Sequence, residues 1–597
     1  MTTTSAAGPP PHEPWPIPDP SVPQLTVRAI MTGMVLGATL SLCNIYAGLK
    51  IGWGFNMSIT AALLSYGFWQ ALHFGAGLRS WNILENNVNQ TAASAAASIS
   101  SAGLVAPIPA WTILTGETLS WTALVIWTFS VSLVGIAVAV ALRRQMLLVD
   151  ELPFPGGIAT GETLKEMYAK GKEAMARVYT LLSGAAVGVA LKISVTVWSL
   201  PKLSVPVSFK AGSVTVTPMN LGLALDPSVL MVGLGALIGM RACWSLLLGA
   251  LVTWGVLAPD LLARGWAQPG KPEAEWFGSI VGWLVWPGVV LLVTSSLTSF
   301  LFSWRSVVRA LTGGRGGGSS AEDHDVPRQW LGAGIIVALV FSVVCQMAFF
   351  SISPLVATLG VILTFVLALV AARVSGETGV TPVGAMGKVT QLTFGAISPG
   401  NVTDNLMTAN VTGGAASQCA DLLHDMKTGL MIGASPRYQA IAQVAGCLAG
   451  ALAGSAAYLL LIPDPQGMLL TPEWAAPAVL QWKAVAEVLT KGFSHLPPGV
   501  GMAMVWGAGL GIGLAVLEKV VPPKVRAWVP SPAALGLAIV VPAHNSISIF
   551  LGGLLALIAF RVHASWAQRF VVVLAAGLIA GESLTGIGVA LQKMLAG

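Results

Sequence analysis

Charged side chains are scarce in this sequence, and that scarcity limits the classes of protein it can belong to. Asp, Glu, Lys and Arg make up 9% of the 597 residues, whereas a soluble domain carries roughly 25%. Hydrophobic residues make up 55%, and the mean hydropathy is +0.76. An ordinary soluble fold is therefore excluded, and the composition indicates an integral membrane protein that crosses the lipid bilayer many times.

Motifs typical of metal-bound and catalytic proteins are also missing. The five cysteines form no CxxC pair, so neither a disulfide framework nor a zinc site is expected. The seven histidines form no HxxxH pair, and the sequence contains neither an HExxH motif nor a nucleophile elbow. We therefore expect no bound metal, no cofactor and no enzymatic activity. No ATP-binding loop is found either. A protein of this kind that transports a solute against its gradient has to draw the energy from an ion gradient.

The net charge of +6 reports membrane topology and not nucleic-acid binding, because Lys and Arg lie in short loops between apolar segments. The basic loops are 143–154, 165–177 and 304–318, which the positive-inside rule places in the cytoplasm. The proline-rich N-terminal segment lacks the apolar core of a cleaved signal. We expect residues 1–24 to be a disordered cytoplasmic tail, and the protein to lie in a plasma membrane, which in a bacterium is the inner membrane.

Apolar runs long enough to cross a membrane recur along the chain. Each crossing takes about 20 apolar residues, and segments 25–49 and 122–142 are two clear examples. Counting such runs predicts an all-α polytopic membrane protein with about 16 transmembrane or re-entrant helices.

Three weak sequence matches in the same order predict an internal duplication. They pair GGIAT (156–160) with GGAAS (413–417), DPSVLMVGLGALIG (226–239) with SPAALGLAIVVPAH (531–544), and SLTS (296–299) with SLTG (583–586). Both copies of the first match enter the membrane from a basic loop, so we expect two fused repeats of the same orientation. The alternative is that Gly/Ala-rich membrane helices resemble each other by composition alone.

A polar, Gly/Ser-rich stretch divides the chain near its middle. Residues 312–327 are expected to form a cytoplasmic linker between a first transmembrane repeat, 25–311, and a second, 328–597. Transporters commonly place their substrate site at the interface between such repeats.

The segment ENNVNQTAASAAAS (85–98) places a carboxylate and several amides between two apolar regions. Its spacing predicts a buried helix whose polar turn faces a water-filled path, because a charge at the centre of a bilayer costs roughly 2.5 to 3.5 kcal/mol. The alternative is that these amides only bond neighbouring helices or lie in an external loop. The residues that we expect to contact substrate here are Asn86, Asn89 and Gln90.

A denser polar cluster lies in segments 376–391 and 398–429, between strongly apolar helices. Prolines and glycines interrupt regular helix there, and irregular backbone at membrane depth is tolerated only against protein or water. We predict the main substrate site here, and the alternative is a structured loop outside the membrane. The expected binding residues are Glu377, Thr378, Lys388, Gln391, Asn401, Asn405 and Asn410.

Carboxylates within apolar surroundings are candidates for proton coupling. Glu582 lies alone in the last apolar segment, where its carboxylate could also be paired to a serine or an amide and take no part in proton transfer. The four candidates are Glu85, Glu377, Asp421 and Glu582.

Five blocks of this sequence resemble the oligopeptide transporter family, which includes the yellow stripe-like metal-chelate transporters. They are NIYAGLKIGWGFNMSI (44–59), ENNVNQTAASAAAS, LPFPGGIAT, GETGVTPVGAMGKVTQL and NVTGGAASQCADLLHDMKTGLMIGASPR (410–437). The resemblance implies a carrier of about sixteen helices, two fused halves of eight, that imports peptides or metal complexes of small amino-acid chelators with protons. Within the first block, Asn44 and Tyr46 join the expected binding residues.

We therefore predict a proton-coupled secondary transporter that imports oligopeptides or peptide-like small molecules by alternating access between two halves. Glu377 and Lys388 are expected to hold the two charges of a peptide-like zwitterion. The first alternative is a carrier of metal complexes of amino-acid-type chelators, and a remoter one is a channel. The expected partners are the small-molecule or peptide substrate, protons and the lipid bilayer, without nucleic acid and with homo-oligomerisation left open.

Overall fold

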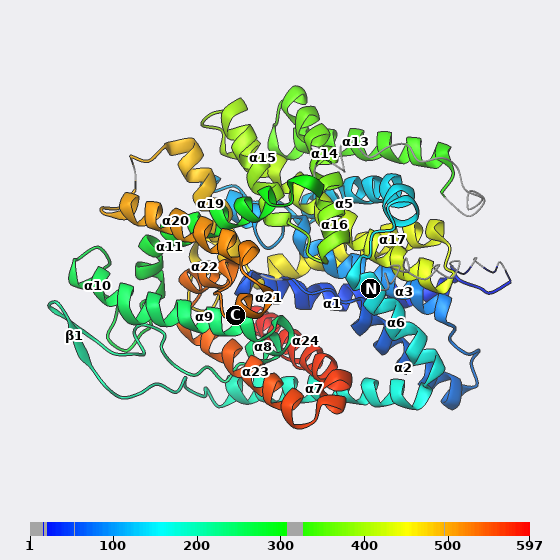
Figure 1. The fold of residues 1–597 in the computed structure, drawn as a ribbon, viewed down its shortest axis with the longest axis horizontal. Coiled ribbons are helices and arrows are strands. Elements are labelled where there is room, and N and C mark those ends of the chain that lie inside the picture. The colour runs from blue at the N-terminus through cyan, green and yellow to red at the C-terminus, as the bar shows by residue number, and fades with distance from the viewer. Residues whose placement is uncertain are drawn as a thin grey trace, which may run out of the picture.

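The fold is a bundle of helices with one short β-hairpin (Figure 1). The structure is a computed structural model, and it describes residues 16, 19, 21–52, 54–306, 308, 326–494 and 496–596. Within these residues, 12 helices are long and apolar enough to cross a membrane. The predicted all-α polytopic class is thereby confirmed. A total of about 16 spans stays a prediction, because shorter or more polar helices fall outside this criterion.

Two predicted segments fall mostly outside the described residues. Of the linker 312–327, only the last two residues are described. Of the tail 1–24, the last residue, Gln24, is buried, and its Oε1 accepts a hydrogen bond from the backbone N of Ser435 at 2.8 Å. The start of the described chain is thus attached to the second half of the sequence.

The helices form two groups, and each group contains helices from both halves of the chain (Figure 1). The first group and the segments packed with it are α1 (Val27–Ile51), α2 (Ser58–Ala76), α3 (Ile83–Ala97), η1 (Ser98–Ala102), α4 (Pro107–Thr115), α5 (Trp121–Arg143), η2 (Arg144–Val149), α6 (Pro155–Ala169), α13 (Arg328–Phe350), α14 (Pro354–Thr378), α15 (Val383–Ile397), α16 (Val402–Ile432), α17 (Pro436–Leu461), α18 (Pro465–Met468) and α19 (Pro477–Lys491).

The second group packs beside the first. Its elements are α7 (Gly171–Val197), β1 (Phe209–Ala211), β2 (Val214–Val216), α8 (Val229–Ile238), α9 (Met240–Val252), η3 (Thr253–Leu257), α10 (Ala258–Ala263), α11 (Phe277–Leu301), α20 (Val500–Val520), α21 (Pro523–Arg526), α22 (Pro532–Val540), α23 (Ala543–Val562) and α24 (Ala564–Ala596). Strands β1 and β2 pair antiparallel and form the hairpin that projects at one end of Figure 1.

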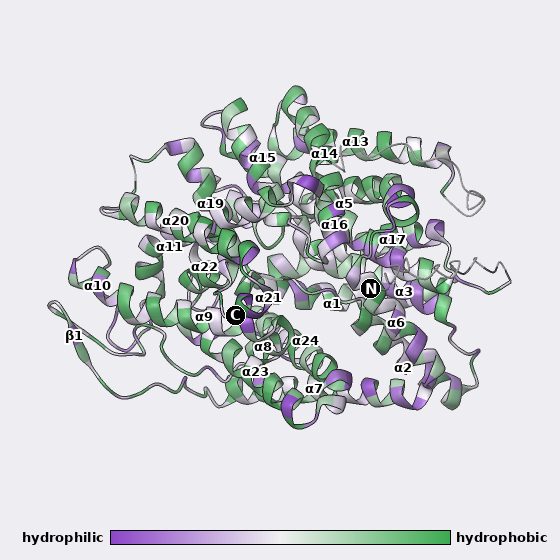
Figure 2. Ribbon diagram, in the orientation of Figure 1, coloured by the Kyte–Doolittle hydropathy of each residue, from purple (hydrophilic) through white to green (hydrophobic). Residues whose placement is uncertain are grey.

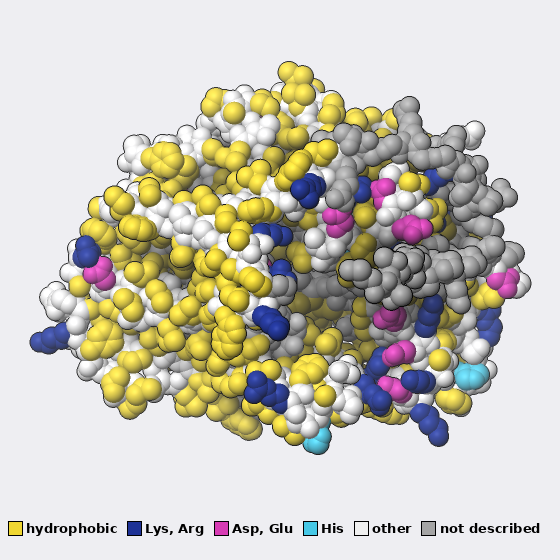
Figure 3. Space-filling view, viewed as in Figure 1, with side chains coloured by type: hydrophobic (Ala, Val, Ile, Leu, Met, Phe, Trp, Pro, Cys, Tyr) yellow, Lys and Arg dark blue, Asp and Glu magenta, His cyan; other side chains and the backbone are white. Residues whose placement is uncertain are grey.

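Apolar side chains cover large areas of the outer surface (Figure 3). Figure 2 shows hydrophobic residues along most helices, with hydrophilic residues concentrated at helix ends and in loops. Large apolar residues such as Tyr179 on α7 and Trp506 on α20 are 65% and 75% exposed. Contiguous apolar surface of this extent suits contact with lipid and not with water.

The structure contains an internal repeat, which is visible in contacts that occur twice. The backbone N of Phe154 donates to the carbonyl O of Gly376 near the end of α14, and the backbone N of Ala476 donates to that of Leu49 near the end of α1, both at 2.9 Å. Phe154 and Ala476 each precede a proline-initiated helix and have φ angles of 44° and 42°. The pair α1 and α6 is thus equivalent to the pair α14 and α19.

Close helix packing repeats in the same way. Gly184 and Gly188 of α7 lie against backbone carbonyls of α24, just as Gly507 and Gly511 of α20 lie against those of α11. Such small residues let membrane helices approach each other closely. In this scheme α8 and α9 correspond to α22 and α23, so the second and third sequence matches fall on equivalent helices.

The two repeats run in opposite directions, so the predicted shared orientation is wrong. Helices α3 and α16 correspond to each other, because Asn82 and Asn401 cap their first turns in the same way. These two helices pack antiparallel: the side chain of Asn410, early in α16, donates to Ala102 O beyond the end of α3, while Asp421, later in α16, bonds Ser94. The prediction failed because the GGIAT and GGAAS match aligned α6 with α16, which are not equivalent helices.

Candidate functional site

A cavity of about 560 Å³ lies where the two repeats meet. We call it the central cavity. The loops that follow α1 and α14 both line it, and each begins with a glycine in the left-handed region, Gly52 (φ 72°) and Gly379 (φ 77°). Ser98 and Ser417, at equivalent positions of the α3 and α16 regions, line it as well. Its size is within the range of about 300 to 1,000 Å³ typical of small-molecule sites.

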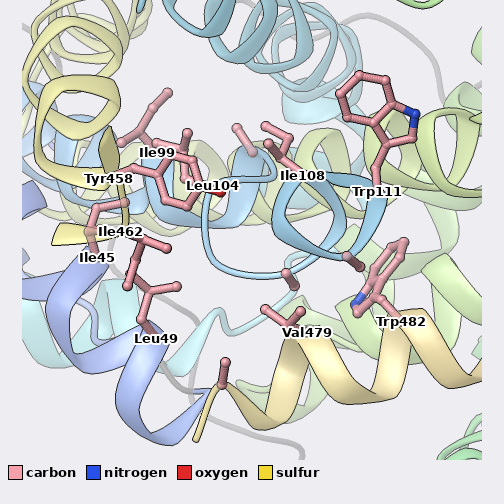
Figure 4. Packing of buried hydrophobic residues seen from close by; sticks show 14 of the residues in the cluster. Ile45, Leu49, Ile99, Leu104, Ile108, Trp111, Tyr458, Ile462, Val479 and Trp482 are labelled. Atoms are coloured by element: carbon pink, nitrogen blue, oxygen red, sulfur yellow. The ribbon is translucent and has the colours of Figure 1, made fainter. Parts of the chain in front are cut away.

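An apolar cluster supports one side of this cavity. The end of α1, the turn between α3 and α4, the end of α17 and the start of α19 meet there (Figure 4). Ile45, Leu49, Ile99 and Leu104 of this cluster are completely buried. Trp482 of α19 belongs to the same cluster and also lines the cavity. A close-packed cluster of this kind holds the cavity-lining loops in place.

One face of α16 forms a wall of the central cavity. Residues three or four apart along a helix lie on the same face, and the lining residues follow that spacing. They are Asn410, Gly413, Gly414, Ser417, Asp421 and His424.

Two of the predicted binding residues, Asn44 and Asn410, line the cavity. The Asn44 amide accepts from the backbone N of Phe55 at 3.0 Å and donates to Phe55 O at 2.9 Å, so it fixes the loop after α1. The Asn410 Oδ1 accepts from the indole Nε1 of Trp127 at 3.1 Å. Both amides are therefore held in defined orientations at the cavity wall.

His424 also lines the cavity and joins three elements there. Its Nδ1 accepts from the backbone N of Gly157 in α6 at 3.2 Å, and its Nε2 lies 3.1 Å from Ser375 Oγ in α14. Because Nδ1 accepts, the neutral ring carries its proton on Nε2 and donates it to the serine. His424 looked isolated in the sequence, and only the packing of α6 and α14 against α16 gives it these partners.

Two buried carboxylates follow each other on α16. Asp421 Oδ1 accepts from Ser94 Oγ at 2.9 Å, and Asp425 Oδ1 accepts from Ser58 Oγ at 3.3 Å. In the part of the chain that the structure describes, the Oδ2 atom of each has no hydrogen-bond partner and neither forms an ion pair. An ionised carboxylate without a cation is costly to bury, so both groups are suited to carrying a proton. Asp421 was among the predicted candidates for proton coupling, and Asp425 was not.

Glu85, in contrast, is fully paired. Its carboxylate bonds Arg28 at 2.5 Å and Arg79 at 3.0 Å, and accepts from Thr26 and Asn82. It lies in the first turn of α3, where a negative charge stabilises the helix. It does not line the central cavity.

The amides that follow Glu85 are buried, as predicted, but bond protein groups away from the central cavity. Asn86 Oδ1 accepts from Ser65 Oγ of α2 at 2.8 Å, and Asn89 Nδ2 donates to the same hydroxyl at 2.9 Å. Gln90 donates to Asn87 and Thr91. None of these lines the central cavity. Asn86 and Asn89 bond a neighbouring helix, as in the alternative, whereas the hydrogen bonds of Gln90 lie within α3.

Lys388 and its neighbours form a network behind the cavity wall. Lys388 Nζ lies 4.4 Å from the ring centroid of Trp482 and donates to Gln391 Oε1 at 3.0 Å. Gln391 Nε2 in turn donates to Asn405 Oδ1 at 3.0 Å. These three side chains are buried and hold α15 against α16 and α19, with Trp482 between the lysine and the cavity.

The remaining predicted residues lie elsewhere. Glu377 pairs with Arg373 at 3.2 Å, Thr378 bonds the backbone of its own helix, and Asn401 caps α16. Tyr46 packs edge-on against Trp474, with centroids 5.4 Å apart. The carboxylate of Glu582 accepts from Ser228 Oγ and the backbone N of Leu230, so it caps α8 and lines a different cavity.

Several lining residues were not predicted from the sequence, namely Ser98, Ser417, His424, Gln481 and Trp482. The residues on α16 could have been found, because polar and small residues recur there every three or four positions from Asn410 to His424. Gln481 and Trp482 carry no such signal, since α19 is an amphipathic helix whose partner cannot be read from its own sequence.

Sequence similarity shows the family of this chain. A family described as OPT oligopeptide transporter protein matches residues 24–592. The chain is 24% identical to a putative oligopeptide transporter of Saccharomyces cerevisiae, over 95% of this chain and 96% of that protein. It is 25% identical to a probable metal-nicotianamine transporter of Oryza sativa (94% and 88%) and 25% identical to a putative oligopeptide transporter of Haemophilus influenzae (91% of each). The chain is therefore an integral membrane protein that belongs to the oligopeptide transporter (OPT) family.

Proposed function

We propose that this protein is a proton-coupled carrier that binds its substrate in the central cavity and works by alternating access. The observation that carries the proposal is the position of the cavity, at the junction of two inverted repeats and between two interrupted helical segments. Secondary transporters commonly bind substrate at such a junction. Polar side chains make up much of its wall, among them Asn44, Asn410 and Ser417, and they suit a small polar substrate.

Proton coupling is assigned to Asp421 and Asp425. Asp421 lines the cavity and Asp425 lies one turn further along α16, so a proton on this pair can respond to the occupancy of the cavity. Glu85, Glu377 and Glu582 each have a positive or hydrogen-bonding partner set of their own. These three are therefore not proposed as proton carriers.

The chemistry of the cavity wall bears on the substrate class. No lysine or arginine is among the described residues that line it, so the free carboxylate of a peptide would lack a cationic partner there. Glu377 and Lys388, expected to bind a zwitterion, do not line it. In a metal complex of an amino-acid-type chelator, the metal ion already neutralises the carboxylates. The wall therefore favours metal complexes, and peptide-like molecules are the second candidate, supported by the names of two relatives.

Uptake by the purified protein in proteoliposomes distinguishes these substrates. An inward proton gradient is imposed, and entry of radiolabelled nickel–nicotianamine is measured with and without an excess of an unlabelled tripeptide, and the reverse. We expect saturable uptake of the complex that the tripeptide inhibits weakly. Uptake of the tripeptide alone would reverse the order of the two candidates, and entry that rises linearly with concentration would support a channel.

A further inference from the structure

A second polar cavity, of about 340 Å³, lies beside the end of α1. We call it the lysine cavity. The end of α7, the starts of α8 and α23, and the middle of α24 also contribute to it. Its lining side chains with charge or an amide are Lys50, Lys192, Lys202, Asp226, Glu473, His544, Asn545 and Glu582.

Part of this charge is already neutralised by internal contacts. Lys202 Nζ pairs with Glu275 at 3.0 Å and contacts the ring of His544 at 3.2 Å. His544 Nε2 lies 3.6 Å from Asp226. The carboxylate of Glu582 already accepts hydrogen bonds at the N-terminus of α8.

Two ammonium groups are left without a carboxylate partner. Among the described residues, neither Lys50 nor Lys192 forms an ion pair. Lys50 Nζ lies 5.3 Å from the ring centroids of both Tyr46 and Trp474. Two aromatic faces position this cation without neutralising it.

A buried amide in the same cavity is also without a partner. Asn545 is 5% exposed and lines the cavity, and within the described part of the chain its side chain makes no hydrogen bond. Buried polar side chains are nearly always hydrogen-bonded. An amide without a hydrogen-bond partner, beside two ammonium groups without a carboxylate partner, indicates a ligand that accepts hydrogen bonds and carries negative charge.

We propose that the lysine cavity binds a small molecule through a carboxylate group held by Lys50, Lys192 and Asn545. Glu473 lies at its exposed edge and has no ion-pair partner among the described residues, so an amino-acid-type ligand can place its ammonium group there. This site is separate from the central cavity, because the two cavities share no lining residue among those that the structure describes: Gly52 lines the central cavity and Lys50 lines the lysine cavity. The proposal does not depend on which molecule is transported.

Protection of lysines from chemical acetylation tests the site directly. The full-length protein in detergent is treated with a small amine-acetylating reagent, with or without glutamate or citrate, and modification is quantified by mass spectrometry. We expect both ligands to protect Lys50 and Lys192, and to leave the exposed Lys210 of the β-hairpin unprotected. Equal labelling with and without these ligands would overturn the proposal, as would equally strong protection by sulfate.

Affinity measurements on variants complete the test. Removing one ammonium or amide group that holds the carboxylate should weaken binding by at least about tenfold, so we expect this decrease for Lys50→Met, Lys192→Met and Asn545→Leu in calorimetry with citrate. Lys210→Met is the matched control and should bind as the wild type does. Lys192→Arg should retain most of the affinity, which separates loss of charge from loss of folding. Wild-type affinity in Lys50→Met and Lys192→Met would contradict the assignment.

Discussion

Asp421 and Asp425 lie one helical turn apart on α16, both are buried, and each is bonded through one oxygen to a serine of another helix, Ser94 of α3 or Ser58 of α2. The two serines belong to the first repeat and the two carboxylates to the second. A proton that binds or leaves this pair therefore acts at the contact between the repeats. That contact is also where α16 lines the central cavity.

Filling the central cavity should abolish transport without unfolding the protein. Ser417→Leu places a larger apolar side chain on the α16 wall, so we expect substrate uptake to fall by more than about tenfold while the melting temperature changes by only a few degrees. Uptake in proteoliposomes and thermal unfolding in detergent are the measurements. Gly509→Leu, on an open position of α20, is the control, and undiminished uptake by Ser417→Leu would place the substrate elsewhere.

The repeat contacts predict where a single methyl group is not tolerated. A Cβ on Gly135 of α5 would lie 2.5 Å from Ala415 O, and a Cβ on Gly450 of α17 would press against Ala96 O at the equivalent position. We expect Gly135→Ala and Gly450→Ala each to lower stability by about 1–3 kcal/mol. Thermal unfolding against Gly513→Ala, where no atom is near, measures this. Unchanged melting temperatures would show that the helices are not packed so closely.

Glu85 is expected to stabilise the fold and not to couple protons. Glu85→Gln removes the charge shared by Arg28 and Arg79, whose side chains are 20% and 56% exposed. Because both arginines keep access to solvent, we expect a loss of about 2 kcal/mol, less than for a fully buried pair. The control, Glu166→Gln, removes a carboxylate that is itself 53% exposed from its pair with Arg177 and should cost less than about 1 kcal/mol. Proton-independent uptake in Glu85→Gln would show instead that Glu85 carries the coupled proton.

Glu275 predicts a pH dependence of stability near the lysine cavity. Burial works against its ionisation, but hydrogen bonds and positive charge from His544 and Lys202 outweigh burial and hold the pKa of this carboxyl below its ordinary value of 4.5. A lowered pKa stabilises the folded protein fully above the unfolded value, and this contribution is lost as the pH falls through the folded value. Between about pH 5 and about pH 3, the melting temperature of the wild type should therefore fall more steeply than that of Glu275→Gln. Glu273→Gln, an exposed neighbour, should follow the wild type.

The fold class could be predicted from the sequence, whereas the assignment of polar residues to the cavity could not. Burial of Asn86 and Asn89 follows from their apolar surroundings, but a helix buried on all sides offers no face by which to choose its partner. Ser65 of α2 takes up their hydrogen bonds. Asn44 and Asn410, two of the expected binding residues, do line the central cavity. They are held there by hydrogen bonds to Phe55 and Trp127, partners that the sequence does not indicate.

The relative direction of the two repeats could not be predicted from the sequence either. Short Gly/Ala motifs recur on many membrane helices, so GGIAT matched α16 although α6 corresponds to α19. The informative features are the Asn caps of α3 and α16 and the backbone bonds of Phe154 and Ala476. These depend on which helix ends meet in three dimensions.

Substrate-driven proton movement is the most direct test of the account. Proteoliposomes containing a pH-sensitive dye receive whichever substrate the uptake assay identifies, and the acidification of the lumen is followed. We predict acidification with the wild type and with Asp260→Asn, an exposed control, and its loss in both Asp421→Asn and Asp425→Asn even where these variants still exchange substrate. Unchanged acidification in the two α16 variants would contradict the assignment of coupling to this pair.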